Sequence, residues 1–490
     1  MPAEQKSTPP SEKLTLWQKI GYGVGDIYGG GSGTIISFYY LVFLTDVVGI
    51  APGLAGTTIL ISKVYDSITD PFEGVLSDRT RTRLGRRRPY LLAGIPLIFL
   101  SFFALFYPVS FEEQWARAVY VVLAYLFFST VISIVLLNYN ALQPELTLDY
   151  DERTALSSTR IFFSTVSSII CAVVPLEIVR LFPDVRTGWT VMALVFGLFF
   201  ALPYIATVAT ARERPEFQTP TEKFHWRQAF VEPFRIRTFL YILFMYVTAF
   251  VAFDATSSIV VFYVKNYLGR GEEVNYVIGA LLVAQVASLP FYLWLSRRTS
   301  KRTGYIVGAV TFVVVMFFSF LITPDSPTFA LYLFAALVGI GTGGVVVMVY
   351  AIFPDIPDID ELQSRQRREG IFAAMTTFSR KVSSAVAVFA VSQMLALSGY
   401  VPPLMETVNG ATRLVEQPQS QTFLLALRLV FVFLPVVFIA AGIYLAFRFP
   451  LTAEIHQRLS AVLAARREGQ ADSPETAQEA ERLAGLLIGG

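Results

Sequence analysis

The feature that most constrains this chain is a series of twelve apolar stretches, each long enough to cross a lipid bilayer as a helix. A transmembrane helix needs about 20 mostly apolar residues, and its backbone polar groups must pair within the helix because lipid offers no partners. The pattern predicts an all-α membrane protein with twelve transmembrane helices. The stretches lie near residues 18–47, 52–76, 89–108, 116–141, 157–182, 188–210, 238–266, 274–296, 303–323, 328–352, 370–398 and 421–448.

The first two stretches differ from the rest. The first is interrupted by three glycines within residues 30–33, and the second carries Lys63, Asp66 and Asp70. Lipid does not tolerate such charges. We therefore expect both helices to face a cavity inside the protein.

Composition excludes several classes of function. Only 16% of the residues are charged and 54% are hydrophobic, whereas soluble domains carry about 25% charged residues. A net charge of +2 indicates no nucleic-acid partner. One cysteine and two histidines leave no basis for a disulfide, a thiolate metal cluster or a Ser-His-Asp triad. No sequence matches a Walker A loop. We expect a transporter rather than an enzyme, with no cofactor.

Arg and Lys are distributed unevenly between the loops, and this predicts the orientation. With the N-terminus in the cytoplasm, the basic loops all lie on the cytoplasmic side: 77–88, 211–237, 297–302 and 365–368. The N-terminus is polar and Pro-rich, which indicates a cytosolic tail and not a signal peptide. We predict a multi-pass protein of the inner (cytoplasmic) membrane with both termini cytoplasmic.

The chain also repeats itself at a spacing of roughly half its length. Residues 39–49 are echoed by 259–269, and residues 76–90 by 295–305. Parallel six-helix halves with a site between them near the membrane midplane are the plan of major facilitator transporters. We predict that fold, with two pseudo-symmetric bundles. The predicted parts are an N-terminal tail 1–17, a first bundle 18–211, a linker 212–237, a second bundle 238–450 and a C-terminal tail 451–490.

Two carboxylates in the second stretch are the strongest chemical signal. Asp66 and Asp70 are four residues apart, so they share one face of a helix. Sodium would compensate their burial, because hard cations prefer oxygen ligands. A proton would also do so, because a desolvated carboxyl group beside another has a raised pKa. The structural alternative is a pair of carboxylates neutralised by Lys63 and another basic residue.

Three more charges lie inside apolar stretches. We hypothesise that Lys381 faces the Asp66/Asp70 cluster across the two halves and releases it when a cation binds. The alternative is that Lys381 snorkels to the cytoplasmic surface beside Arg380. Asp26 and Asp254 could each bind a substrate hydroxyl, and each could equally be a structural hydrogen-bond partner.

Long motifs in this sequence resemble the glycoside–pentoside–hexuronide:cation symporter family, which includes the melibiose permease. They are YGVGD, FLTDVVG, KVYDSITDPFEGVLSDRTRTRLGRRRPY (63–90), NYNALQPELTLDYDERTALSSTR (138–160), PDIPDIDELQSRQRREGIF (354–372) and TTFSRKVSS (376–384). The resemblance covers nearly all of residues 18–448. It implies the major facilitator fold and cation-coupled sugar transport.

The resemblance also implies roles for individual residues. The family's cation ligands fall at Asp66, Thr69, Asp70 and Ser133, with Asp66 and Asp70 as the metal ligands if the cation is sodium. Its coupling lysine falls at Lys381 and its helix-five arginine at Arg160. Substrate contacts are expected at Asp26, Asn138, Asn140, Arg160, Asp254 and Thr377. The loop between the second and third stretches looks like the family's version of the major facilitator loop motif. The resemblance implies a cytoplasmic gate there, formed by Asp78, Arg79, Gly85 and Arg86.

The resemblance does not identify the substrate. The acidic sugar anchors of the melibiose permease fall at Gly30 and Leu136, and its stacking tryptophans fall at Asn140 and Val346. The cation machinery is therefore implied, whereas the galactoside-binding set is not.

We predict a monomeric symporter of a sugar, glycoside or related small polar solute, coupled to sodium or a proton and working by alternating access. One alternative is a transporter of an amphipathic solute such as a lysolipid, which relatives of the family carry in animals. A membrane-embedded enzyme or a lipid scramblase is the alternative from another class. The scarcity of histidine and cysteine and the internal duplication argue against an enzyme.

Overall fold

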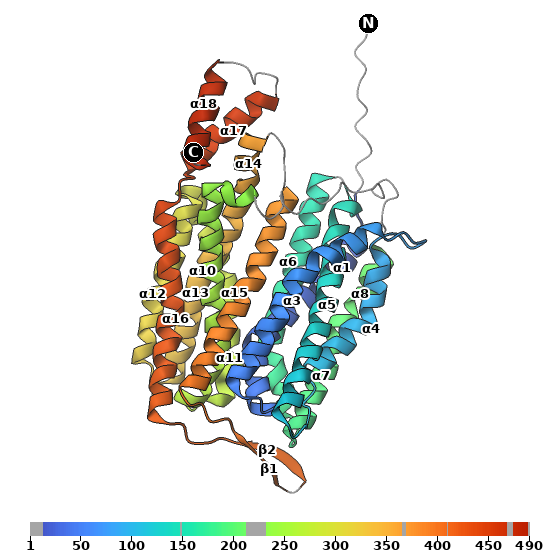
Figure 1. Ribbon diagram of the computed structural model, residues 1–490, viewed down its shortest axis with the longest axis vertical. Helices are drawn as coiled ribbons and strands as arrows, with labels where there is room; N and C mark the ends of the chain where they lie inside the picture. Colours follow the sequence, from blue (N-terminus) through green and yellow to red (C-terminus); the bar gives the residue numbers. More distant parts are fainter. Residues whose placement is uncertain are drawn as a thin grey trace.

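The computed structural model describes residues 13–147, 149–211, 232–364, 369–408, 410–467 and 474–488. Most of the expected N-terminal tail and of the expected linker 212–237 falls outside these ranges. The described chain is helical apart from one short β-hairpin. The long helices run side by side along the length of the molecule (Figure 1).

The helices up to residue 210 form one side of the molecule (Figure 1). They are α1 (Leu16–Gly23), α2 (Asp26–Ile35) with the π-helical turns η1 (Ile36–Tyr40) and η2 (Phe43–Val47), α3 (Pro52–Arg79), α4 (Arg88–Leu105), α5 (Gln114–Leu146), α6 (Tyr150–Arg180), α7 (Val185–Ala201) and α8 (Pro203–Thr210). Among them, α2 packs against α6, and α4 packs against α5 and α7.

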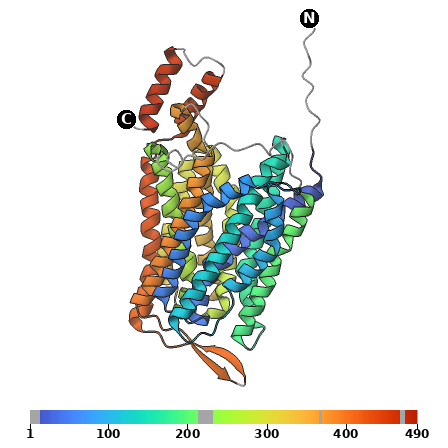
Figure 2. The same ribbon diagram turned by 45° about the vertical axis from the view of Figure 1, so that its right-hand side comes forward.

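The helices from residue 237 onward form the other side (Figures 1 and 2). They are α10 (Arg237–Phe262) with η5 (Tyr263–Tyr267), α11 (Val274–Arg298), α12 (Lys301–Phe318), α13 (Thr328–Ile352), α14 (Ile356–Ser364), α15 (Glu369–Leu397), α16 (Gln421–Arg448), α17 (Ala453–Arg467) and α18 (Pro474–Leu487). Short 3-10 turns are η4 (Glu232–Arg235), η6 (Gly271–Glu273), η7 (Ser319–Leu321) and η8 (Phe353–Asp355). The hairpin strands are β1 (Leu404–Val408) and β2 (Ala411–Val415).

Helices occupy each of the twelve predicted stretches. Within the described residues, ten helical spans are long and apolar enough to cross a membrane. The other two are the segment from α1 to η2 and helix α3, the same two stretches whose glycines and charges set them apart in the sequence. The two sides of the molecule meet where α3 packs against α15, α6 against α11, and η1 against α10.

The glycines of the first stretch lie within a continuous helix. Helix α2 runs through all three, and the chain departs from the regular α-helix before them, at residues 24–25, and after them in η1 and η2. A Cβ atom on Gly30 would lie 2.3 Å from Ser164 Oγ, and one on Gly31 would lie 2.2 Å from Ser167 Oγ. These two glycines therefore allow close packing of α2 on α6. Of the three, Gly33 has open space beside it.

The two ends of the molecule carry different extra elements. Helices α1, α17 and α18 lie at one end, called here the terminal end, and the β-hairpin lies at the opposite hairpin end (Figure 1). Helices α17 and α18 pack against each other and against α14. The hydroxyl of Thr238 donates a hydrogen bond to the Leu487 carbonyl at 2.6 Å, so the tail is fastened to the start of α10.

Candidate functional site

A buried ion pair joins the two sides of the molecule near their middle. Asp66 lies halfway along α3, and Lys381 lies near the middle of α15. The Lys381 ammonium is 2.5 Å from Asp66 Oδ2 and donates to Ser133 Oγ on α5 at 3.0 Å. Ser133 donates in turn to Asp66 Oδ1 at 3.3 Å. Asp66 is only 2% exposed, and a buried carboxylate without a partner of opposite charge is costly.

The other expected cation ligands are placed differently. Thr69 donates its hydroxyl to the Asp66 backbone carbonyl at 3.3 Å, which is a bond along the helix and not a contact with the carboxylate. The side chain of Asp70 lies outside the described part of the structure. Its backbone continues α3, so it occupies the face of that helix four residues beyond Asp66. Asp66 and Ser133 are thus the expected ligands whose side chains the described structure brings together.

Arg160 organises a second polar cluster on α6. Its guanidinium donates to Gln143 Oε1 at 2.6 Å and to Asn140 Oδ1 at 2.7 Å, and it lies 3.3 Å from Asp26 Oδ1. It also lies 4.7 Å from the ring centroid of Tyr139. The structure therefore brings Asp26, Asn140 and Arg160 together as the sequence analysis grouped them.

Tyr139 is not available as an open stacking platform. Its ring stacks on Tyr22 with centroids 4.7 Å apart, and Arg160 lies over the same ring. The ring is fully buried, and its hydroxyl donates to the Tyr22 carbonyl at 2.8 Å. The aromatic face is therefore covered, whereas Asn140 at the polar edge is exposed.

Asn138 does not join the Arg160 cluster. Its amide donates to the Ile134 carbonyl at 2.8 Å, and its Oδ1 accepts a short hydrogen bond from the Ser77 hydroxyl. Arg87 donates to the same Ser77 hydroxyl at 2.6 Å. These contacts connect Asn138 to the loop that follows α3, so the structure separates it from the other expected substrate residues.

Asp254 is buried against an arginine that the sequence analysis did not assign to the site. Arg380 donates to both oxygens of Asp254, with one of the two bonds at 2.9 Å. Its guanidinium also covers the ring of Phe250 at 4.5 Å. Arg380 and Lys381 are consecutive on α15, yet they pair with carboxylates on different sides of the molecule. Thr377, one turn earlier on α15, is exposed.

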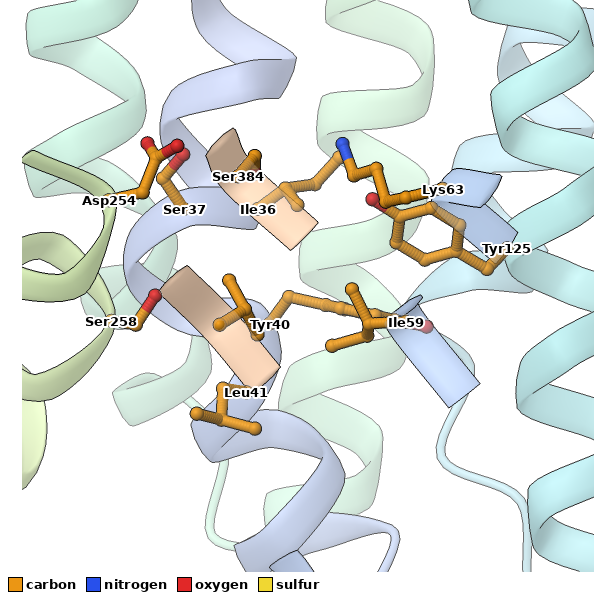
Figure 3. A pocket seen from close by; sticks show the side chains of 11 residues that line it. Ile36, Ser37, Tyr40, Leu41, Ile59, Lys63, Tyr125, Asp254, Ser258 and Ser384 are labelled. Atoms are coloured by element: carbon orange, nitrogen blue, oxygen red, sulfur yellow. The ribbon is translucent and has the colours of Figure 1, made fainter. Parts of the chain in front are cut away.

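A narrow cavity lies between the two sides beside these pairs (Figure 3). Lys63 from α3 and Asp254 from α10 point toward it from opposite directions (Figure 3). Its remaining lining is Ile36, Ser37, Tyr40, Leu41, Ile59, Tyr125, Ser258, Ser384 and Val388. A volume of about 20 Å³ holds roughly one water molecule and no sugar. The structure is therefore narrow at the centre, and the helices must separate there to admit a solute.

Sequence reasoning missed several polar residues around this centre. Arg380 was considered only as a neighbour of Lys381, and Gln143 and the three serines of the cavity were not considered. Ser258 follows Asp254 by four residues, and Ser384 follows Arg380 by four, so helical periodicity places each pair on one face. That spacing was the available signal.

The basic loop after α3 is held inside the first group of helices. Gly85 adopts a φ of 109°, a conformation that disfavours residues with a Cβ atom. Arg86 pairs with Glu145 on α5 at 2.7 Å. The Asp78 and Arg79 side chains of the expected gate motif lie outside the described side chains.

Comparisons with known proteins bear on the family and the fold of this chain. A family model described as MFS/sugar transport protein matches residues 21–453. An uncharacterized symporter from Synechocystis sp. is 28% identical, over 94% of this chain and 98% of the relative. The isoprimeverose transporter of Lactiplantibacillus pentosus is 25% identical, over 82% of this chain and 84% of the relative. An inner membrane symporter of Escherichia coli is 26% identical, over 80% and 84% respectively.

Among solved structures, the nucleoside transporter NupG superposes with a TM-score of 0.57, covering 89% of this chain and 97% of the NupG chain. Sequence identity in that pair is 11%, so this likeness speaks for the fold alone. It agrees with the major facilitator fold that the sequence predicted.

Proposed function

This chain belongs to the MFS/sugar transport protein family, and we propose that it couples the movement of a sugar or glycoside to that of a cation. It is a multi-pass membrane transporter and not an enzyme. The observation that carries the proposal is the buried pair of Asp66 and Lys381, which joins the two sides of the molecule. Charged side chains inside a membrane protein are costly and by default mark a functional site.

In the proposed cycle, the coupling cation competes with Lys381 for the Asp66 carboxylate. The Ser133 hydroxyl already contacts both partners, so it would supply a second oxygen once Lys381 withdraws. Sodium would use these oxygens as hard ligands, whereas a proton would simply neutralise the carboxylate. Cation binding thus removes the charge pair that ties α3 to α15. By linkage, a substrate that prefers the released state increases the affinity for the cation by the same factor.

The proposed substrate contacts are the polar edges of Asp26, Asn140 and Arg160, to which the structure adds Gln143 as a further candidate. Amide and guanidinium groups can exchange their mutual hydrogen bonds for bonds to sugar hydroxyls. The named substrates of relatives, such as isoprimeverose, support a sugar or glycoside. We propose sidedness from the basic loops: the terminal end faces the cytoplasm, the hairpin end faces outward, and the protein is a monomer of the inner membrane.

Binding calorimetry on the purified protein tests this function. Isoprimeverose and a panel of other sugars and glycosides would be titrated with sodium, with choline in its place, and at several pH values. Tighter binding of one sugar with sodium or at lower pH is the expected result and identifies the cation. Sugar binding that does not depend on either cation would contradict coupling. No binding of any panel member would contradict the substrate class.

We expect Arg160→Ala to weaken substrate binding more than cation binding. The substitution removes the group that orients Asn140 and Gln143, and losing hydrogen bonds to a charged donor costs about 1.5–3 kcal/mol. That range corresponds to a roughly tenfold to hundredfold loss of sugar affinity. Calorimetry with saturating cation measures it. A larger loss of cation affinity would place Arg160 in the coupling machinery instead.

We propose that Arg380 is a positioning residue for Lys381. Its bidentate pairing with Asp254 fixes α15 against α10 one residue before the coupling lysine. Arg380→Gln should therefore lower the cation dependence of sugar binding several-fold, with sugar affinity at saturating cation changed less. Arg380→Lys should restore part of the dependence because it keeps the charge. If Asp254→Asn instead reduces sugar affinity at saturating cation, Asp254 is a sugar ligand.

A further inference from the structure

The β-hairpin between α15 and α16 crosses from one side of the molecule to the other. It leaves the second group of helices and reaches the start of α7 in the first group (Figure 1). Its strands pair in antiparallel register from Leu404–Val415 to Val408–Ala411, and Gly410 in the turn has a φ of 78°. A regular hairpin at this position is a preformed element and not a loose connection.

The tip of the hairpin is bound to the N-terminus of α7. Asp184 caps that helix, accepting from the Thr187 amide at 2.8 Å, and its other oxygen accepts from the Thr412 amide of β2 at 2.9 Å. Arg186 also contacts the sulfur of Met405 on β1. Hydrogen bonds from Thr187 hold the pKa of the Asp184 carboxyl at about 2, below its ordinary value. The acceptor is therefore ionised at neutral pH, which strengthens both bonds.

The base of the hairpin is bound to the first stretch by a buried charge cluster. Lys265 of η5 lies 2.8 Å from Glu416, just after β2, and 2.5 Å from Asp46 of η2. The Tyr400 hydroxyl, just before β1, donates to the other oxygen of Asp46 at 2.7 Å. Asp46 is only 3% exposed. Lys265 of the second group of helices and Tyr400 beside the hairpin thus both contact one carboxylate of the first group, and Glu416 pairs with the same lysine.

We propose that residues 398–408 and 410–420 form a strap that holds the hairpin end closed and must detach from α7 and from Asp46 before the pathway opens at that end. Separating the two sides there increases the distances from Asp184 to Thr412 and from Asp46 to Lys265 and Tyr400. The tip contact lies at the start of α7 and the base contact in η2, so the strap is held to the first group at two separate points. The strap would act whichever solute and cation the protein carries, and its test uses neither of them.

The test cross-links the strap to the start of α7 and measures how fast a reagent reaches the central cavity. The background is Cys171→Ala, which removes the single cysteine, with Ser258→Cys added as the reporter because Ser258 lines the cavity. Asp184→Cys and Thr412→Cys are joined by oxidation to a disulfide before the label is added. The control pair, Val401→Cys and Gln419→Cys, joins the two ends of the strap to each other, where Gln419 donates to the Val401 carbonyl.

A membrane-impermeant maleimide is added at the hairpin end, and mass spectrometry of the peptide that carries residue 258 gives the labelling rate of the Ser258→Cys reporter separately from that of the reduced strap thiols. We expect linking the strap to α7 to slow labelling at least tenfold, with recovery on reduction, and the control link to leave the rate unchanged. Equal rates in the linked and reduced proteins would overturn the proposal. Thermal unfolding and gel filtration verify that each variant is folded.

A second variant loosens the strap without relying on a cross-link. Asp184→Ser keeps a good cap for α7. It leaves one side-chain oxygen in place of the two that accept from the Thr187 and Thr412 amides. We expect the Ser258→Cys reporter to be labelled several-fold faster in this variant, with the melting temperature of the protein little changed. Unchanged or slower labelling would mean that the tip contact does not restrain opening.

Discussion

Asp66→Asn is expected to abolish cation-stimulated uptake while the protein remains folded. Asparagine keeps an oxygen that can accept from Ser133 and Lys381, so the local packing survives. It removes the negative charge for which Lys381 and the coupling cation compete in the proposed cycle. Sodium or proton binding would then lose its electrostatic driving force at the centre of α3. We expect a loss of at least tenfold in cation-dependent uptake, equivalent to about 1.4 kcal/mol.

Uptake into vesicles with imposed sodium and pH gradients measures this effect. Asp325→Asn is the matched control, because Asp325 is an exposed carboxylate between α12 and α13, and we expect its uptake to equal that of the unchanged protein. Downhill sugar exchange without a gradient distinguishes a coupling defect from a folding defect. Full coupling in Asp66→Asn would remove Asp66 from the proposed cation site.

The sequence made the centre of the protein predictable because charge inside an apolar stretch is rare and must be compensated. Asp66, Asp26, Asp254 and Lys381 all stand out for that reason, whereas Arg160 was assigned through the family resemblance. In the structure, Lys381 on α15 of the second group of helices contacts Asp66 on α3 of the first group. The partners themselves were harder to assign, because four acids and several bases allow many pairings. Only the packing of α10 and α3 against α15 assigns Arg380 to Asp254 and Lys381 to Asp66.

Other features had no local signal in the sequence. Asn138 is a polar residue next to Tyr139 and was grouped with the substrate residues, yet helix rotation turns it toward Ser77. Gly30 and Gly31 interrupt the apolar pattern of the first stretch, from which we expected a helix facing a cavity, and in the structure they permit close contact with α6. The strap was not foreseen, because its contacts with Asp184 and Asp46 join positions more than 200 residues apart in the chain.

Lys381→Ala should uncouple the two fluxes or stop transport. Without the ammonium group, Asp66 is a buried carboxylate whose partner of opposite charge has been removed, and breaking such a pair destabilises a protein by about 3–5 kcal/mol. The carboxylate would relieve this by retaining a proton or a cation throughout the cycle. A cation that is not released cannot be exchanged between the two faces of the membrane, so gradient-driven accumulation should fall at least tenfold.

Combining Lys381→Ala with Asp66→Asn separates the ion pair from other roles of the lysine. With both charges removed, no buried charge lacks a partner at this pair, so the double variant should unfold at a higher temperature than Lys381→Ala alone. It should remain unable to accumulate substrate against a gradient, because the site of competition is gone. Wild-type accumulation by Lys381→Ala would mean that this lysine has no part in coupling. If the single and double variants unfold at the same temperature, the broken ion pair does not account for the loss of stability. Substitutions of two residues that interact with each other must have non-additive effects on stability.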